Sequence, residues 1–104
     1  MNTEIKINEA AMEVKLSGRL DSATAPELDK AVTPRLEGIT ALTLDFTELL
    51  YLSSAGLRVI LSLKKKMNAV EGTLCVRNPN EMIMDVFEAT GFADILDIRK
   101  EEQA

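Results

Sequence analysis

The spacing of apolar residues switches between a strand pattern and a helix pattern along this 104-residue chain, and no other feature limits its fold as strongly. Apolar and polar residues alternate over residues 5–7 and 12–16, which predicts two strands joined through residues 8–11 as a hairpin. Beyond the hairpin, helical and strand-like spacing follow each other to the end of the chain. A hairpin followed by alternating helices and strands predicts an α/β fold, with a mixed sheet of four to five strands covered by three to four helices.

Capping and helix-breaking residues mark where these elements begin and end. Thr24 is the expected N-cap of the first helix, because Pro26 and Glu27 follow it at the positions that helix starts favour. Pro34 should kink or end that helix, since a proline inside a helix removes a hydrogen bond and clashes one turn back. The later expected elements are strands over 42–46, 74–76 and 96–98, helices beginning at 53–54 and 78–81, and a helical turn over 93–95. The expected core residues are Leu16, Leu42, Leu44, Phe46, Leu57, Ile60, Leu61, Leu74, Val86 and Phe87.

The charge balance disfavours nucleic acid and membrane surfaces as partners. The chain has 17 acidic and 12 basic residues, a formal net charge of −5 and a pI of about 4.7, so phosphate backbones and anionic lipids would be repelled. The apolar runs are too short to span a membrane, and the N-terminus lacks the basic-then-apolar pattern of an export signal. We therefore expect one cytoplasmic domain over residues 1–104, with a charged tail from about residue 100 to 104 that frays.

Missing residue types exclude most catalytic chemistry. There is no histidine, which removes the base of serine and cysteine hydrolases and the commonest metal ligand. The single cysteine, Cys75, can form neither an internal disulfide nor a thiolate metal site, and its apolar neighbours predict a small buried core residue. The five glycines are spaced like turns and helix ends rather than like a phosphate-binding loop. We expect a protein that is not an enzyme and that has no metal or cofactor site.

The segment Ser53-Ser54-Ala55-Gly56-Leu57 stands where a strand passes into a helix, and it places hydroxyl groups among the unpaired amides of the helix N-terminus. Three roles fit a serine at this position. One serine can cap the helix, and loss of the Ser54 hydroxyl is expected to remove that cap. A phosphoserine would be stabilised there by the amides and the helix dipole. A nucleophilic serine fits less well, because neither a histidine nor a G-x-S-x-G pattern accompanies it.

Four segments, in order and at matching spacing, resemble one known family over nearly the whole chain. They are residues 18–25, which include Gly-Arg-Leu-Asp; residues 44–49; residues 52–61, which include Ser-Ser-Ala-Gly-Leu; and residues 78–96, which end in Thr-Gly-Phe-Ala-Asp-Ile-Leu. The family is the STAS domain, found in sulfate transporters and anti-sigma factor antagonists. Its stand-alone bacterial members often read Asp-Ser-Ser/Thr/Ala-Gly-Leu where this chain has residues 53–57.

The resemblance implies a STAS-like mixed sheet and the role of an anti-sigma factor antagonist. Such a protein, when unphosphorylated, binds a cytoplasmic serine kinase that doubles as an anti-sigma factor, so that a sigma factor is released, and a serine phosphatase is a further candidate partner. Carried over by position, the phosphoacceptor is Ser54. Ser53 stands in place of the family's aspartate and becomes a second candidate. The expected partner-binding residues are Asp21, Ser22, Thr24, Ser53, Ser54, Ala55, Gly56 and Arg58.

Two other classes of function stay open. A non-switching STAS module would be a structural subunit of a larger regulatory or transport assembly, with Ser54 acting only as a cap. A small-ligand module would use the same helix N-terminus to bind a nucleotide or another anion. Detection of a phosphorylated peptide containing Ser53 and Ser54 in protein from its own host would favour a switching antagonist over a non-switching STAS module.

Overall fold

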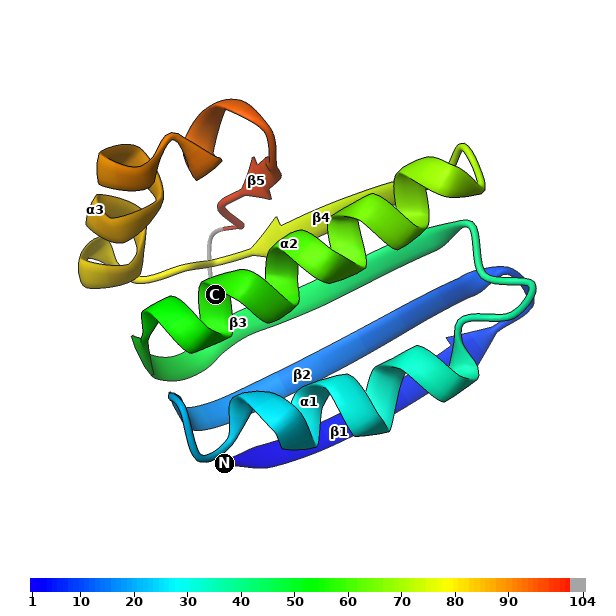
Figure 1. Cartoon of the computed structure of the whole chain (residues 1–104), viewed down its shortest axis with the longest axis horizontal. Helices are drawn as coiled ribbons and strands as arrows, with labels where there is room; N and C mark the ends of the chain where they lie inside the picture. The colour runs from blue at the N-terminus through cyan, green and yellow to red at the C-terminus, as the bar shows by residue number, and fades with distance from the viewer. Residues whose placement is uncertain (102–104) are drawn as a thin grey trace.

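The computed structural model describes residues 1–101, and its elements follow the predicted order (Figure 1). The strands are β1 (Asn2–Asn8), β2 (Ala11–Leu20), β3 (Ala41–Leu52), β4 (Thr73–Arg77) and β5 (Asp97–Arg99). The helices are α1 (Ala25–Val32), α2 (Ser54–Ala69) and α3 (Glu81–Thr90), and the short 3₁₀ helices are η1 (Thr33–Arg35) and η2 (Phe92–Asp94). The predicted strand over 42–46 is longer than expected, because the apolar run that follows it continues the same strand.

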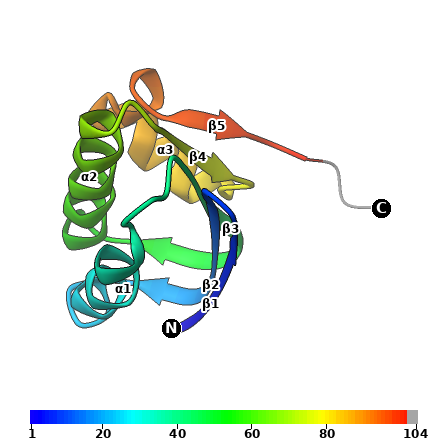
Figure 2. The same ribbon diagram turned by 90° about the vertical axis from the view of Figure 1, so that its right-hand side faces the viewer.

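The five strands form one mixed sheet in the order β1-β2-β3-β4-β5. β1 and β2 are antiparallel and form the predicted hairpin, whereas β2 to β5 pair in parallel. Each parallel neighbour is therefore reached through a crossover that contains one of the three longer helices. α1 and α2 lie side by side over one face of the sheet, and no helix covers the other face within the described chain (Figure 2).

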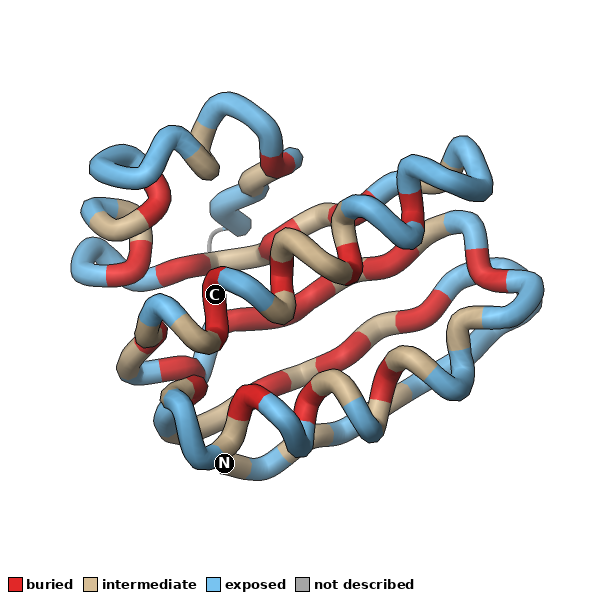
Figure 3. Tube along the Cα trace, viewed as in Figure 1, coloured by how far each residue is buried: buried red, intermediate tan, exposed pale blue. Residues whose placement is uncertain are grey.

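The core lies between this covered face and the helices (Figure 3). Eight of the ten expected core residues are buried, but Leu61 and Val86 are only half-buried. In α2 the buried residues are Gly56, Leu57, Ile60, Leu63 and Met67. Leu61 falls at the edge of that stripe, because the helix is rotated so that Leu63 faces the sheet instead. The expectation for Leu61 and Val86 is corrected accordingly.

The uncovered face of the sheet is polar, and Cys75 lies on it. Cys75 stands between the buried residues Leu74 and Val76 of β4, so its side chain points to the opposite face and is half-buried. The prediction of a buried core cysteine is therefore wrong, since helices cover only one face. Even so, partial burial and the nearby Asp97 carboxylate raise the pKa of the Cys75 thiol.

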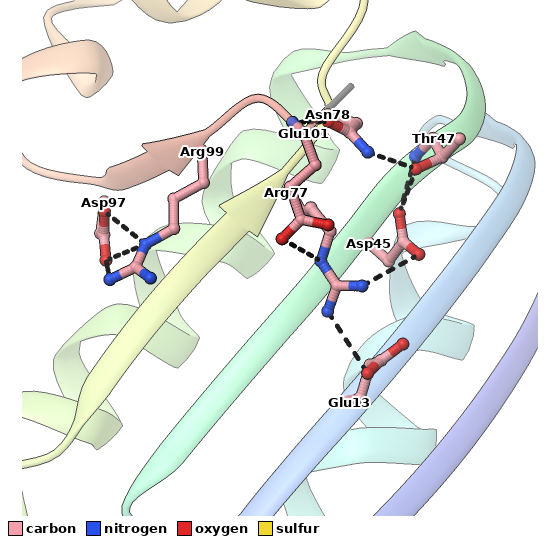
Figure 4. A network of polar contacts seen from close by, with 8 residues as sticks. All are labelled: Glu13, Asp45, Thr47, Arg77, Asn78, Asp97, Arg99 and Glu101. Atoms are coloured by element: carbon pink, nitrogen blue, oxygen red, sulfur yellow. Dashed lines mark hydrogen bonds and ion pairs between the residues drawn. The ribbon is translucent and has the colours of Figure 1, made fainter. Parts of the chain in front are cut away.

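Two predictions concern where segments end. α1 stops at Val32 and continues as the 3₁₀ turn η1 around Pro34, which confirms the predicted early stop. The expected fraying of the tail stays a prediction; within the tail, the Glu101 backbone N–H donates to Asn78 Oδ1 at 2.6 Å and its carboxylate lies 3.9 Å from the Arg77 guanidinium (Figure 4). Residues 102–104 of the expected tail lie outside the described residues.

Candidate functional site at the start of helix α2

The predicted site residues come from two loops that follow neighbouring parallel strands. β2 leads into the loop over residues 21–24, and β3 leads directly into α2. Leu20 and Leu52 are paired at the ends of these strands, and the Ser53 backbone N–H donates to Leu20 O at 2.9 Å. The starts of α1 and α2 therefore lie beside each other at one end of the sheet (Figure 1).

The two serines have different roles at the start of α2. Ser53 is the N-cap: its backbone is extended, and its Oγ accepts a hydrogen bond from the Gly56 backbone N–H at 3.3 Å. Ser54 is the first helical residue, is exposed, and has no side-chain hydrogen bond to any of residues 1–101. The expectation that the Ser54 hydroxyl supplies the cap is therefore wrong, because the capping side chain belongs to the residue before the first helical one.

Gly56 allows α2 to begin close against the strand ends. It is buried, and a Cβ at this position would lie 2.6 Å from Leu52 Cδ1 and 2.8 Å from Leu20 Cγ. Contacts this short would force the packed leucines to move. The absence of a side chain at Gly56 thus fixes how the serine pair is presented above β2 and β3, whereas Ala55 beside it is half-buried.

The loop before α1 is held by Asp21 and Thr24. Asp21 Oδ1 accepts from the backbone N–H groups of Ala23 at 3.0 Å and Thr24 at 3.1 Å. These bonds stabilise the carboxylate, and the bond from Thr24 is the main reason that the pKa of Asp21 is below its usual value. Ser22, between them, is exposed.

Thr24 precedes α1 as predicted, but its hydroxyl does not cap the helix. Thr24 Oγ1 accepts from the Asp21 backbone N–H at 2.9 Å and donates to Arg19 O at 2.8 Å, so it stabilises the loop instead. A capping side chain would find no free backbone N–H at the second and third helical positions. Pro26 has no N–H, and the Glu27 N–H donates to Thr24 O at 3.0 Å. The predicted capping role of Thr24 is corrected on this ground.

Two residues near the site, Arg19 and Tyr51, were not singled out from the sequence. They are paired between β2 and β3, and the Arg19 guanidinium lies 4.1 Å from the centre of the Tyr51 ring. Its Nε is also 3.9 Å from Asp21 Oδ2. A cation–π contact at an exposed position stabilises by about 0.5–1 kcal/mol, so this cluster ties the Asp21 loop to the end of β3.

Arg58 and Asn80 complete this end of the molecule. Arg58 is exposed and lies one helical turn after Ser54, so both side chains occupy the same face of α2. Asn80, which the sequence suggested only as a helix start, caps α3 through its Oδ1, and its Nδ2 donates to Leu49 O at 3.2 Å. Because β3 and β4 are parallel, α3 begins at the same end of the sheet as α1 and α2.

Neither a metal cluster nor a membrane-spanning helix is found among residues 1–101. No three His, Cys, Asp or Glu side chains of this part are placed to hold a metal ion. No helix within it is long and apolar enough to cross a lipid bilayer. What the described site offers is an exposed hydroxyl, a helix N-terminus and a cation one turn away.

Comparison with solved structures confirms the predicted fold. The anti-sigma factor antagonist SpoIIAA in its unphosphorylated form matches with a TM-score of 0.87 at 17% identity, over 98% of this chain and 90% of SpoIIAA. An anti-sigma factor antagonist from Mycobacterium paratuberculosis matches with a TM-score of 0.84 at 22% identity, over 94% of this chain and 84% of that one. The match to SpoIIAA includes the five-stranded mixed sheet with its N-terminal hairpin and the three helices.

Sequence comparison identifies the family. The anti-sigma-B factor antagonist of Bacillus subtilis (strain 168) is 31% identical over 98 residues, which cover 94% of this chain and 90% of that protein. Its counterpart from Staphylococcus aureus (strain NCTC 8325 / PS 47) is 29% identical over 101 residues, with coverage of 96% and 94%. The model of the STAS domain family matches residues 2–104. On this match and on the identity to the Bacillus protein, the chain belongs to the STAS domain family.

Proposed function

We propose that this protein is an anti-sigma factor antagonist that binds a cytoplasmic anti-sigma factor with serine kinase activity, and that phosphorylation of Ser54 releases this partner. The observation that carries the proposal is the division of roles between the two serines. Ser53 Oγ is engaged as the N-cap, whereas the Ser54 hydroxyl is exposed at the first helical position. Two relatives named as anti-sigma-B factor antagonists, at 31% and 29% identity, support the class of partner.

Ser54 is a better phosphoacceptor than Ser53 on geometric grounds. A kinase must bring its phosphate donor to the hydroxyl, and Ser54 is exposed whereas Ser53 is only partly so. Phosphorylation of Ser53 would also place the phosphate on the oxygen that accepts from the Gly56 N–H. Ser53 takes the position of the family's aspartate, and its hydroxyl performs the capping that a carboxylate can perform there.

A phosphate on Ser54 should leave the fold intact. It would carry a charge of about −1.5 to −2, and the helix dipole stabilises an exposed anion at this end by roughly 0.3–1 kcal/mol. Arg58, one turn along the same face, adds a cation nearby. The effect of phosphorylation is therefore expected in partner binding and not in folding.

The surface around Ser54 is the proposed contact with the anti-sigma factor. At the surface it comprises Asp21, Ser22, Thr24, Ser53, Ser54, Ala55 and Arg58; Gly56, also expected to contact the partner, is buried beneath them and acts by positioning the start of α2. A partner that packs closely against a neutral hydroxyl would meet a dianion after phosphorylation, and desolvation would oppose binding. A loss of about 3 kcal/mol weakens affinity more than a hundredfold. A serine phosphatase would restore the binding form.

Phosphate transfer tests the proposal. The purified protein is incubated with ATP and its cognate anti-sigma factor, and the product is digested and sequenced by mass spectrometry. We expect one phosphate on the peptide that contains Ser53 and Ser54, retained in Ser53→Ala and absent from Ser54→Ala. Ser54→Asp should lose partner binding, whereas Ser54→Ala should keep it. Phosphate on Ser54→Ala but not on Ser53→Ala would move the acceptor to Ser53, and an unlabelled wild-type protein would favour a non-switching module.

A further inference from the structure

Helix α2 has a charge pattern opposite to that of the whole chain. Its sixteen residues include four basic side chains and no acidic one, although the chain has a net charge of −5. All 17 acidic residues therefore lie outside α2. The basic residues are Arg58, Lys64, Lys65 and Lys66. α1 has both acidic and basic side chains, whereas all the charged side chains of α3 are acidic.

The outward face of α2 contains a shallow hollow of about 450 Å³. Its lining residues are spaced by three or four positions, which places them on a single face of the helix. We call this surface the basic groove; it is lined by Arg58, Leu61, Ser62, Lys65, Lys66 and Ala69. From its first to its last residue it is about 16 Å long, at the rise of 1.5 Å per helical residue. Leu61 gives the groove an apolar, half-buried wall between its cations.

The cations of the groove have no carboxylate partner within the described part of the chain. The ion pairs of that part involve Lys15, Arg19, Arg77 and Arg99, none of which belongs to α2. Arg77 shows the contrast, since Glu13, Asp45 and Glu101 surround its guanidinium on the other face of the sheet (Figure 4). In the groove, Lys66 Nζ donates only to the Ser62 hydroxyl, at 2.7 Å.

We propose that the basic groove docks an acidic helical segment of a partner protein, which under the function proposed above belongs to the anti-sigma factor. Arg58, Lys65 and Lys66, which line the groove together with the apolar Leu61, complement a helix that presents Asp or Glu next to Leu or Met. The length of the groove corresponds to about three helical turns. The groove begins at Arg58, one turn from Ser54, so a single partner can cover both surfaces.

A protein segment fits the groove better than a nucleic acid or a lipid bilayer. Both of these present phosphate charges over a wide surface, and the net charge of −5 of the whole chain would oppose them. A short acidic segment contacts the groove alone. Phosphorylation of Ser54 would also place a dianion one turn from Arg58, where it competes with the partner's carboxylates for that guanidinium.

Charge reversal away from Ser54 tests this docking. We would compare the double variant Lys65→Glu/Lys66→Glu with Lys6→Glu/Lys100→Glu, which makes the same charge change at exposed lysines outside α2. With the cognate anti-sigma factor, the first variant should bind about tenfold more weakly, mainly through slower association, and the difference should shrink at high salt. The second should bind like the wild type. Equal effects of the two variants, or no effect of the first, would overturn the proposal.

A second measurement tests the groove without the anti-sigma factor. It is needed because a failure of the cognate anti-sigma factor to bind at all would refute the proposed function but would leave the groove undecided. The full isotope-labelled chain is titrated with an acidic amphipathic peptide of roughly 14 residues, about four helical turns, and with its Gln-substituted counterpart. Amide shifts concentrated at residues 58–69 for the acidic peptide alone support the groove. Shifts elsewhere, equal shifts with both peptides, or co-sedimentation with phosphatidylserine vesicles that Lys65→Glu/Lys66→Glu abolishes would contradict it.

Discussion

Replacing Ser53 and Ser54 one at a time should affect stability very differently, because only Ser53 caps α2. Ser53→Ala removes the oxygen that accepts from the Gly56 N–H at 3.3 Å. Gly56 is buried, so water cannot readily take over that bond. Loss of an N-cap lowers the free energy of unfolding by about 0.5–2 kcal/mol. Because the Gly56 amide is left without its partner in a buried residue, we expect Ser53→Ala to fall in the upper half of this range, at about 1–2 kcal/mol.

Ser54→Ala should have almost no effect on folding. The exposed Ser54 hydroxyl has no hydrogen bond to residues 1–101, and exposed substitutions of this kind stay within about 0.5 kcal/mol. Ser53→Asp serves as a matched control, since aspartate also accepts at an N-cap and adds negative charge where the helix dipole favours it. It should be at least as stable as the wild type.

Urea unfolding followed by circular dichroism measures these differences directly. For a domain of this size, 1 kcal/mol also shifts the melting temperature by about 4–8 °C, which thermal unfolding resolves. The reasoning is refuted if Ser54→Ala is as destabilising as Ser53→Ala, or if Ser53→Asp is no more stable than Ser53→Ala.

Three further predictions concern the core, the Asp21 loop and Cys75. Leu44→Ala should destabilise the domain by about 2–5 kcal/mol, because Leu44 is fully buried in β3. Leu50→Ala, at a residue that is 63% exposed, should change the stability by less than about 0.5 kcal/mol in the same urea assay. Folding lowers the pKa of the Asp21 carboxyl. The ionised carboxylate therefore stabilises the folded protein fully above the pKa that Asp21 has in the unfolded chain, and this stabilisation is lost as the pH falls through the pKa of Asp21 in the folded protein. The stability advantage of the wild type over Asp21→Asn should therefore shrink on acidification below about pH 4, and a constant difference would contradict this cause. Because burial raises the pKa of the Cys75 thiol, iodoacetamide should alkylate the folded protein at neutral pH more slowly than the same protein in urea.

Features set by nearby residues were predictable from the sequence. The hairpin follows from the alternation over residues 5–7 and 12–16, and the end of α1 follows from Pro34, whose ring and missing N–H stop the helix. Gly91 ends α3 with a φ of 81°, a conformation that glycine adopts without strain. Each of these depends on chemistry within a few positions of the chain.

Features set by packing were harder to predict. Leu61 and Leu63 both fit an apolar stripe, and only the rotation of α2 over the sheet decides that Leu63 is buried. Cys75 appeared to be a core residue because its neighbours are apolar, yet burial in β4 alternates and only one face is covered. The hydrogen bond from the Glu101 backbone N–H to Asn78, more than twenty positions earlier in the chain, likewise depends on tertiary packing.

The candidate site shows the same division. Residues 53–56 and 21–24 were identified from sequence, and the paired ends of β2 and β3 bring them together. The contact of Arg19 with Tyr51 was missed, because it depends on a register that shifts twice along β2, between Lys15 and Ser17 and between Gly18 and Arg19. Which serine caps α2 also depended on where the helix begins, a boundary that sequence patterns locate only to within a few residues.

The affinity of the anti-sigma factor for the two forms of this protein tests the central proposal most directly. Unphosphorylated protein and protein fully phosphorylated at Ser54 are titrated into the cognate anti-sigma factor in a calorimeter, with circular dichroism to confirm that both are folded. We predict tight binding of the unphosphorylated form and affinity more than a hundredfold weaker after phosphorylation, a loss of about 3 kcal/mol. Equal affinity of the two folded forms would contradict the proposal that Ser54 is the switch.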